Sequence, residues 1–168
     1  RELNNAIEEI FIPDIEILNN KEKVKKENIS KIYERIFRGS YPELYKNKNM
    51  SLEAFFSSYI RTYIERDVRE LLSKVDNIQF SDFIRSAACR VGQLLNIHDI
   101  AKDVGVSDDT AKKWLQILEK SDVIFYVRPY SNNLLKRTMK TPKMYFFDTG
   151  LVAYLTRYSS PDILMNVN

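Results

Sequence analysis

Residues with the chemistry for catalysis or metal binding are few and far apart in this chain of 168 residues. One histidine, His98, and one cysteine, Cys89, cannot make a zinc site of the usual composition. A serine-based mechanism needs His98 as its base, yet His98 falls inside a helix-turn-helix pattern and is more simply a helix-face residue. The four glycines are not clustered as a phosphate-binding loop requires. We therefore expect no catalytic activity, metal or cofactor in this chain.

Composition restricts the class of protein further. Lys and Arg total 26 against 23 Asp and Glu, and the resulting net charge of +3 is too small to identify a nucleic-acid partner by itself. Ten Tyr and nine Phe indicate a packed core rather than a disordered segment. A single cysteine excludes an internal disulfide and fits a reducing cytoplasm, where we expect the protein. No apolar run approaches the roughly 20 residues of a membrane span, so we expect no membrane partner.

The distribution of charge is more informative than its sum. Between Arg128 and Lys143 every charged residue is basic. We call residues 128–143 the basic arm, and its charges are Arg128, Lys136, Arg137, Lys140 and Lys143. Such a segment favours a polyanionic partner such as DNA.

The elements before the basic arm fit a helix-turn-helix. Ala101 is small where a second helix would cross closely, and Gly105 supplies a turn without Cβ four residues later. Ser107 is a natural N-cap for the second helix, on which Trp114 faces inward. Apolar, β-branched and aromatic residues then predict strands at 123–127 and 143–147. We therefore expect a winged helix over residues 96–148, with the basic arm as its wing.

In winged helices the second helix enters the major groove and the wing contacts the DNA backbone. Against DNA binding, Asp108 and Asp109 lie where phosphate would approach, and winged helices also dock proteins. One continuous exposed basic patch would favour DNA, whereas a dominant apolar patch would favour protein docking. DNA binding and protein docking therefore stand as alternative functions. The candidate DNA contacts are Thr110, Lys112, Lys113, Gln116, Lys136, Arg137, Lys140 and Lys143.

Helical periodicity also marks the preceding segment. Apolar residues at helical spacing predict one helix over 52–72, with Ser51 as N-cap, and another over 80–95. We expect the two to pack as a hairpin, forming a helical connector over 49–95. Asp67 falls inside the apolar stripe of the first helix, so we expect it to be buried and paired with a basic side chain. The expected fold is thus mainly α, with a small β-hairpin wing.

Three ordered stretches, residues 37–44 (FRGSYPEL), 59–68 (YIRTYIERDV) and 140–151 (KTPKMYFFDTGL), resemble prokaryotic AAA+-like P-loop ATPases that carry a domain of unknown function. The resemblance implies an interior fragment that lacks the P-loop. Residues 1–48 would be the end of the ATPase lid, and residues 149–168 the start of a C-terminal region. It implies an upstream ATPase domain using ATP and Mg²⁺ and a downstream restriction-endonuclease-like domain, both outside this chain. The chain itself would be a regulatory, nucleic-acid-binding module; its oligomeric state is left open.

The resemblance also suggests a nucleotide contact within residues 39–42. In related signalling ATPases a glycine-rich turn in the lid packs its proline on adenine. By this resemblance Tyr41 and Pro42 would face the base and Arg38 would reach a phosphate, although Ser40 stands where a second glycine is usual. The alternative is a simple turn after a helix. At the other end of the resemblance, we expect Asp148 to be the N-cap of a helix over 151–156.

Overall fold

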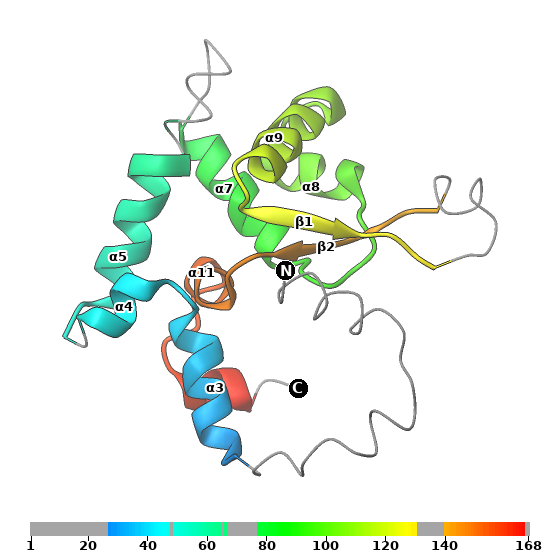
Figure 1. Cartoon of the computed structure of the whole chain (residues 1–168). Helices are drawn as coiled ribbons and strands as arrows, with labels where there is room; N and C mark the ends of the chain where they lie inside the picture. Colours follow the sequence, from blue (N-terminus) through cyan, green and yellow to red (C-terminus); the bar gives the residue numbers. More distant parts are fainter. Residues whose placement is uncertain (1–26, 48, 65, 67–76, 131–139, 167–168) are drawn as a thin grey trace, which may run out of the picture.

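The computed structural model describes residues 27–47, 49–64, 66, 77–130 and 140–166. Over this part of the chain the protein is mainly helical with one small antiparallel β-hairpin, which confirms the expected fold class (Figure 1). None of the helices described there has the length and apolar composition to cross a membrane. The elements in chain order are α3 (Ile29–Arg38), α4 (Pro42–Lys46), α5 (Leu52–Tyr59), η1 (Ile60–Ile64), α7 (Asn77–Ala88), α8 (Ile97–Val104), α9 (Asp108–Lys120), β1 (Ile124–Val127), β2 (Lys143–Phe146), α11 (Thr149–Leu155) and α12 (Pro161–Met165).

Polar N-caps define where the helices begin. The predicted caps Ser51 and Ser107 accept hydrogen bonds from Ala54 N at 3.3 Å and Thr110 N at 3.1 Å. Each such bond satisfies one of the N–H groups that the first turn of a helix leaves without a partner. Helix α8 ends at Gly105, whose φ of +68° is the left-handed conformation that glycine adopts without strain.

The segment after Ser51 departs from the expected single helix. Helix α5 ends at Tyr59 and the chain continues as the π-helix η1 from Ile60 to Ile64. Simple 3.6-residue spacing does not reveal this change, because a π-turn adds one residue while leaving apolar residues close to the same face. Asp67 and the rest of the expected helix lie outside the described residues.

The helix expected over 80–95 is shorter than predicted, because α7 ends at Ala88. Gly92 adopts a φ of +77°, and the chain from there runs beside β2. Gly92 N donates to Met144 O at 2.7 Å and Leu95 N donates to Pro142 O at 2.9 Å. Val91 and Leu94, expected on the buried helix face, are instead 37% and 62% exposed. Sheet pairing thus replaces the last turn that the apolar spacing predicted.

Helices α7, α8 and α9 and the hairpin surround one core. Trp114 is buried on α9, and its indole meets the Phe80 and Phe83 rings edge-on at centroid distances of 5.3 and 5.0 Å. Strand β1 pairs antiparallel with β2, with Ile124 opposite Phe146 and Val127 opposite Lys143. Helices α7, α8 and α9 are thus followed by the hairpin, and the winged helix expected over 96–148 stays a prediction.

Helix α11 connects the two halves of the chain. It packs against α3, α5, α7 and β2, and α3 also packs along α12. Helices from the first and last of the expected segments, 1–48 and 149–168, are therefore in direct contact (Figure 1). The expected domain boundaries stay predictions.

Candidate nucleic-acid interface

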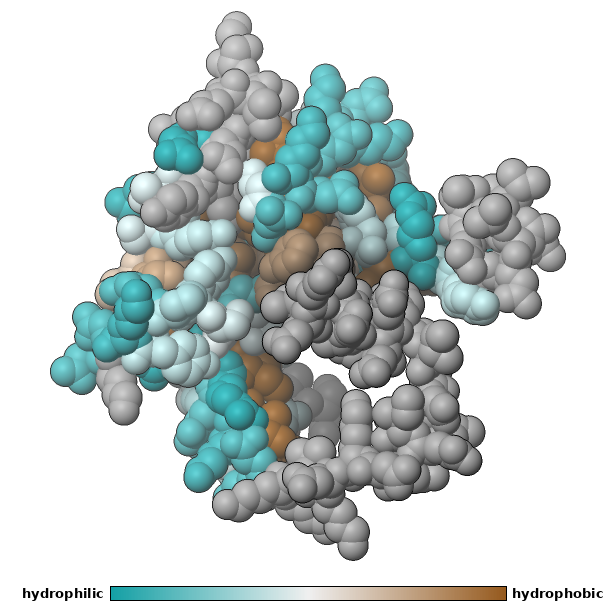
Figure 2. All heavy atoms as spheres, viewed as in Figure 1, coloured by the Kyte–Doolittle hydropathy of each residue, from teal (hydrophilic) through white to brown (hydrophobic). Residues whose placement is uncertain are grey.

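The outward face of α9 is polar. Lys112, Lys113 and Gln116 are exposed, and Figure 2 shows a hydrophilic surface over this helix. Thr110 is only half-buried, but its Oγ1 lies 2.9 Å from the Oγ of the capping Ser107. Thr110 therefore takes part in closing the helix start and is less available to a base edge than Gln116.

The two acids that argued against DNA each have a cationic or titratable neighbour. His98 Nδ1 lies 3.2 Å from Asp108 Oδ1, and Lys112 Nζ lies 3.9 Å from Asp109 Oδ1. All four side chains are at least half exposed, so both pairs are weak and screened by salt. His98 is thus a surface residue on α8 whose Nδ1 faces Asp108.

The basic arm begins and ends on the hairpin. Arg128 follows β1, Lys143 opens β2, and Lys140 lies just before it; all three are exposed. Among the described residues none of the three makes a side-chain hydrogen bond or ion pair. Lys136 and Arg137 lie outside the described residues. The part of the arm that is described therefore presents cationic groups that have no partner among the described residues.

The outer face of the hairpin is apolar, a feature that was not predicted from the sequence. Phe125 stacks on Tyr145 at 5.6 Å and contacts Phe147 at 4.8 Å between ring centroids. Val127 is 46% and Phe147 56% exposed on this side, while Ile124 and Met144 point into the core. Alternation of side chains along a strand would have placed these residues on one face. Hence an apolar outer surface lies next to the cations of the arm.

The turn proposed to contact nucleotide is held by contacts within the protein. Arg38 donates from Nε and Nη2 to Leu44 O at 3.2 and 2.6 Å. The Tyr41 ring lies against Phe55 and Tyr59 at 5.3 and 5.0 Å. Burial, and then its hydrogen bond with Tyr59, raises the pKa of Tyr41 well above its usual range.

Pro42 is the first residue of the short helix α4, a position where its missing N–H costs nothing. These contacts explain the turn without a nucleotide. A nucleotide contact by Arg38, Tyr41 or Pro42 stays a prediction.

Asp148 connects this turn to α11. Its Oδ1 accepts from Leu151 N at 2.7 Å, as expected of the N-cap, while its Oδ2 accepts from Ser40 N at 2.6 Å and Ser40 Oγ at 2.9 Å. The carboxylate is 4% exposed. The Ser40 N–H group is therefore already hydrogen-bonded within the protein.

Two glycines allow this close approach. A Cβ on Gly39, whose φ is +82°, would lie 2.5 Å from Asp148 Oδ1. A Cβ on Gly150 would lie 2.7 Å from the Arg38 backbone. We call Gly39, Ser40, Asp148 and Gly150 the junction. No signal short of the family resemblance marks it in the sequence, since Ser40 and Asp148 are 108 positions apart.

The described residues contain no group of three His, Cys, Asp or Glu side chains that could hold a metal ion. Residues 29–162 match the family described as "Domain of unknown function (DUF8612)". The chain belongs to this family. The matched range starts at the first residue of α3 and ends in α12, so the family includes both sides of the junction and the hairpin.

Two mycobacterial proteins are similar to the chain. They are "Uncharacterized protein Mb2031c" of Mycobacterium bovis and "Uncharacterized protein Rv2008c" of Mycobacterium tuberculosis, each 29% identical over 114 residues. The alignment covers 68% of this chain and 26% of either relative, so the chain spans about a quarter of their length. No solved structure matches the chain.

Proposed function

We propose that this chain is a non-catalytic, winged-helix module of a larger P-loop ATPase and that it contacts duplex DNA through the basic arm and α9. The observation that carries the proposal is the set of exposed cations Arg128, Lys140 and Lys143, which have no partner among the described residues. Unpaired like charges held on one hairpin repel one another unless a polyanion neutralises them. The hairpin would contact the phosphate backbone beside the groove that α9 enters.

The same geometry favours weak binding with little sequence discrimination. Lys113 and Gln116 are exposed on α9, whereas Asp109 at its start is 86% exposed and repels phosphate. Phosphate contacts position a protein on DNA, and base contacts specify the sequence. With Gln116 as the main candidate for reading a base edge, affinity comes mostly from charge.

The proposal assigns the hydrolysis of ATP with Mg²⁺ to parts of the parent outside this chain. The hydrogen bond from Ser40 N–H to the Asp148 carboxylate supports a structural role for this turn within the chain. The share of the mycobacterial relatives that the chain covers leaves room for an ATPase domain and a nuclease-like domain in the parent. Contact between α3 and α11 supports coupling of the lid to the winged helix.

A charge-reversal experiment tests the DNA contact. We expect Lys140→Glu with Lys143→Glu to abolish binding of a fluorescent DNA duplex at low salt, with little change in the thermal melt, because both lysines are exposed. The matched control is Lys31→Glu with Lys46→Glu, which makes the same change in net charge on the exposed surfaces of α3 and α4. Equal losses in both double variants, or no binding by the wild type, would refute the proposal.

A second candidate function is docking of a protein on the apolar outer face of the hairpin. Exposed Val127, Phe147 and Leu94 favour it, because an antiparallel sheet in water usually has one polar face. Phe147→Ser with Val127→Thr distinguishes the two functions. If this variant binds DNA as the wild type does, DNA binding depends on the charged residues and not on the apolar face. If it still self-associates without DNA, or still binds the rest of the parent chain, proteins do not dock on this face.

A further inference from the structure

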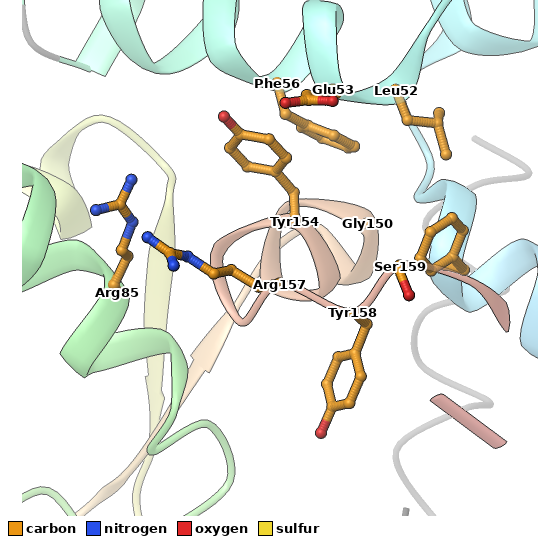
Figure 3. A pocket seen from close by; sticks show the side chains of 10 residues that line it. Leu52, Glu53, Phe56, Arg85, Gly150, Tyr154, Arg157, Tyr158 and Ser159 are labelled. Atoms are coloured by element: carbon orange, nitrogen blue, oxygen red, sulfur yellow. The ribbon is translucent and has the colours of Figure 1, made fainter. Parts of the chain in front are cut away.

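A cavity of about 600 Å³ lies among α3, α5, α7 and α11, away from the basic arm (Figure 3). Phe37, Leu52 and Phe56 provide apolar wall. The residues of the lining with polar side chains are Glu53, Arg85, Tyr154, Arg157, Tyr158 and Ser159. A volume of this size with a few converging polar groups is typical of small-molecule sites.

Arg157 has an unusual backbone conformation for its residue type. Its φ is +61°, directly after the C-cap Thr156 of α11. Arg157 N donates to Tyr154 O at 3.1 Å and Tyr158 N donates to Ala153 O at 3.0 Å. This is the helix ending in which glycine is the favoured residue, because any Cβ is strained there. The fold thus holds an arginine in a conformation that favours glycine, and its side chain lines the cavity.

The charges lining the cavity are not balanced. Arg85 makes one ion pair, with Asp82 at 3.1 Å, and both side chains are more than 40% exposed. Among the described residues the Arg157 side chain makes no hydrogen bond or ion pair. Both arginines line the cavity, and in Figure 3 the Arg157 side chain extends toward the Arg85 guanidinium group, with Glu53 on α5. Two guanidinium groups facing one space repel each other, and a dianion between them would remove that repulsion.

We propose that this cavity binds a small phosphorylated molecule. Its phosphate lies between Arg85 and Arg157, and a hydroxyl or amino group of its body donates to Glu53. Guanidinium forks match the oxygen geometry of phosphate, and the Tyr154 hydroxyl in the same lining supplies a further donor. The carboxylate of Glu53 disfavours a ligand that is anionic at both ends. This site is independent of the nucleic-acid contact, since none of its residues belongs to the basic arm or α9.

Calorimetric titration of the full chain with inorganic phosphate and with glycerol 3-phosphate, at constant ionic strength, tests the proposal. We expect both to bind and glycerol 3-phosphate to bind more tightly. Arg157→Gly should weaken both by at least about tenfold, because it removes a charge-assisted donor. Without ligand, the same substitution should raise the Tm by about 2–4 °C, because glycine relieves the strained conformation. A higher Tm together with weaker phosphate binding would show that Arg157 serves the ligand and not the stability of the fold.

Asp122→Gly is the matched control, because Asp122 also has a positive φ, 52°, just after α9. It should raise the Tm slightly and leave phosphate binding unchanged. Arg85→Gln should weaken phosphate binding as Arg157→Gly does, while Lys140→Glu with Lys143→Glu should leave it unchanged. Absence of phosphate binding by the wild type, or wild-type affinity in both Arg157→Gly and Arg85→Gln, would overturn the proposal.

Discussion

The polar groups of the junction are buried and hydrogen-bonded, whereas the charged groups of the basic arm are exposed and have no partner among the described residues. At the junction, the buried Asp148 carboxylate accepts three hydrogen bonds, and the glycines on either side leave no room for another group. On the arm, Arg128, Lys140 and Lys143 are exposed and have no partner among the described residues. Contacts within the protein therefore account for the junction residues, whereas the described residues offer no partner to the charges of the arm.

This difference changes how the resemblance to ATPases is understood. The stretches at 37–44 and 140–151 meet at the junction, through Ser40 and Asp148. Gly39 and Gly150 in these stretches allow the close packing of α3 on α11, which accounts for these two glycines without a nucleotide. The function must be sought where residues have no structural reason, which are the arm and the cavity with Arg157.

The largest expected effect concerns the core shared by α7, α8, α9 and the hairpin. It tests whether this core, and not the basic arm, stabilises that part of the chain. Trp114→Ala should lower the free energy of unfolding by about 3–5 kcal/mol, because it leaves a large cavity beside Phe80 and Phe83. Urea denaturation measures this change. A loss below 1 kcal/mol would contradict the packing described for α9.

The next effect concerns the junction. Asp148→Ala should cost about 2–4 kcal/mol of unfolding free energy, because Leu151 N–H and Ser40 N–H lose their acceptor. Asp162→Ala is the control, since Asp162 is an exposed acid in the first turn of α12 and its loss should cost under about 1 kcal/mol. Equal losses would mean that water replaces the carboxylate as the acceptor for the Ser40 and Leu151 N–H groups.

Substitutions at two glycines test how closely the chain packs at the junction. Gly150→Ala should destabilise by about 2–3 kcal/mol, because the new Cβ would meet the Arg38 backbone at 2.7 Å. Gly105→Ala should cost only about 1 kcal/mol, because its Cβ would meet nothing within 4 Å and only the positive φ is strained. Thermal melts of the two variants check this order: the Tm of Gly150→Ala should be lower than the Tm of Gly105→Ala.

The smallest effect depends on pH. A hydrogen bond from Ser86, together with Arg90, lowers the pKa of Asp103 below its ordinary 3.8. Since the folded-state pKa is the lower one, the stabilisation is present above pH 3.8 and is lost as the pH falls through the folded-state value. Asp103→Asn should therefore cost under about 1 kcal/mol at pH 7, reduced by solvent screening because the side chain is 43% exposed. Urea titrations should show the difference shrinking in acid.

Local features were predictable from the sequence and distant ones were not. Caps such as Ser51 and Ser107, the burial of Trp114 and the hairpin follow from residue types a few positions apart. The early end of α7 was missed, because Val91 and Leu94 continue a helical spacing while their backbone pairs with β2. The junction and the conformation of Arg157 depend on contacts between distant segments or on a helix ending without glycine, which periodicity does not encode.

The central claim, that the arm binds DNA through charge, is tested most directly by the salt dependence of duplex binding. Each phosphate contact releases condensed counterion, so log K should fall with log salt by about 0.9 per contact. With the acids of α9 opposing approach, we expect a slope of roughly −3 to −5 for the wild type, from three to five contacts on that rule. Lys136→Glu with Arg137→Glu should abolish binding without changing the melt. A slope near zero, or binding that survives this reversal, would contradict the account and favour the protein-docking function.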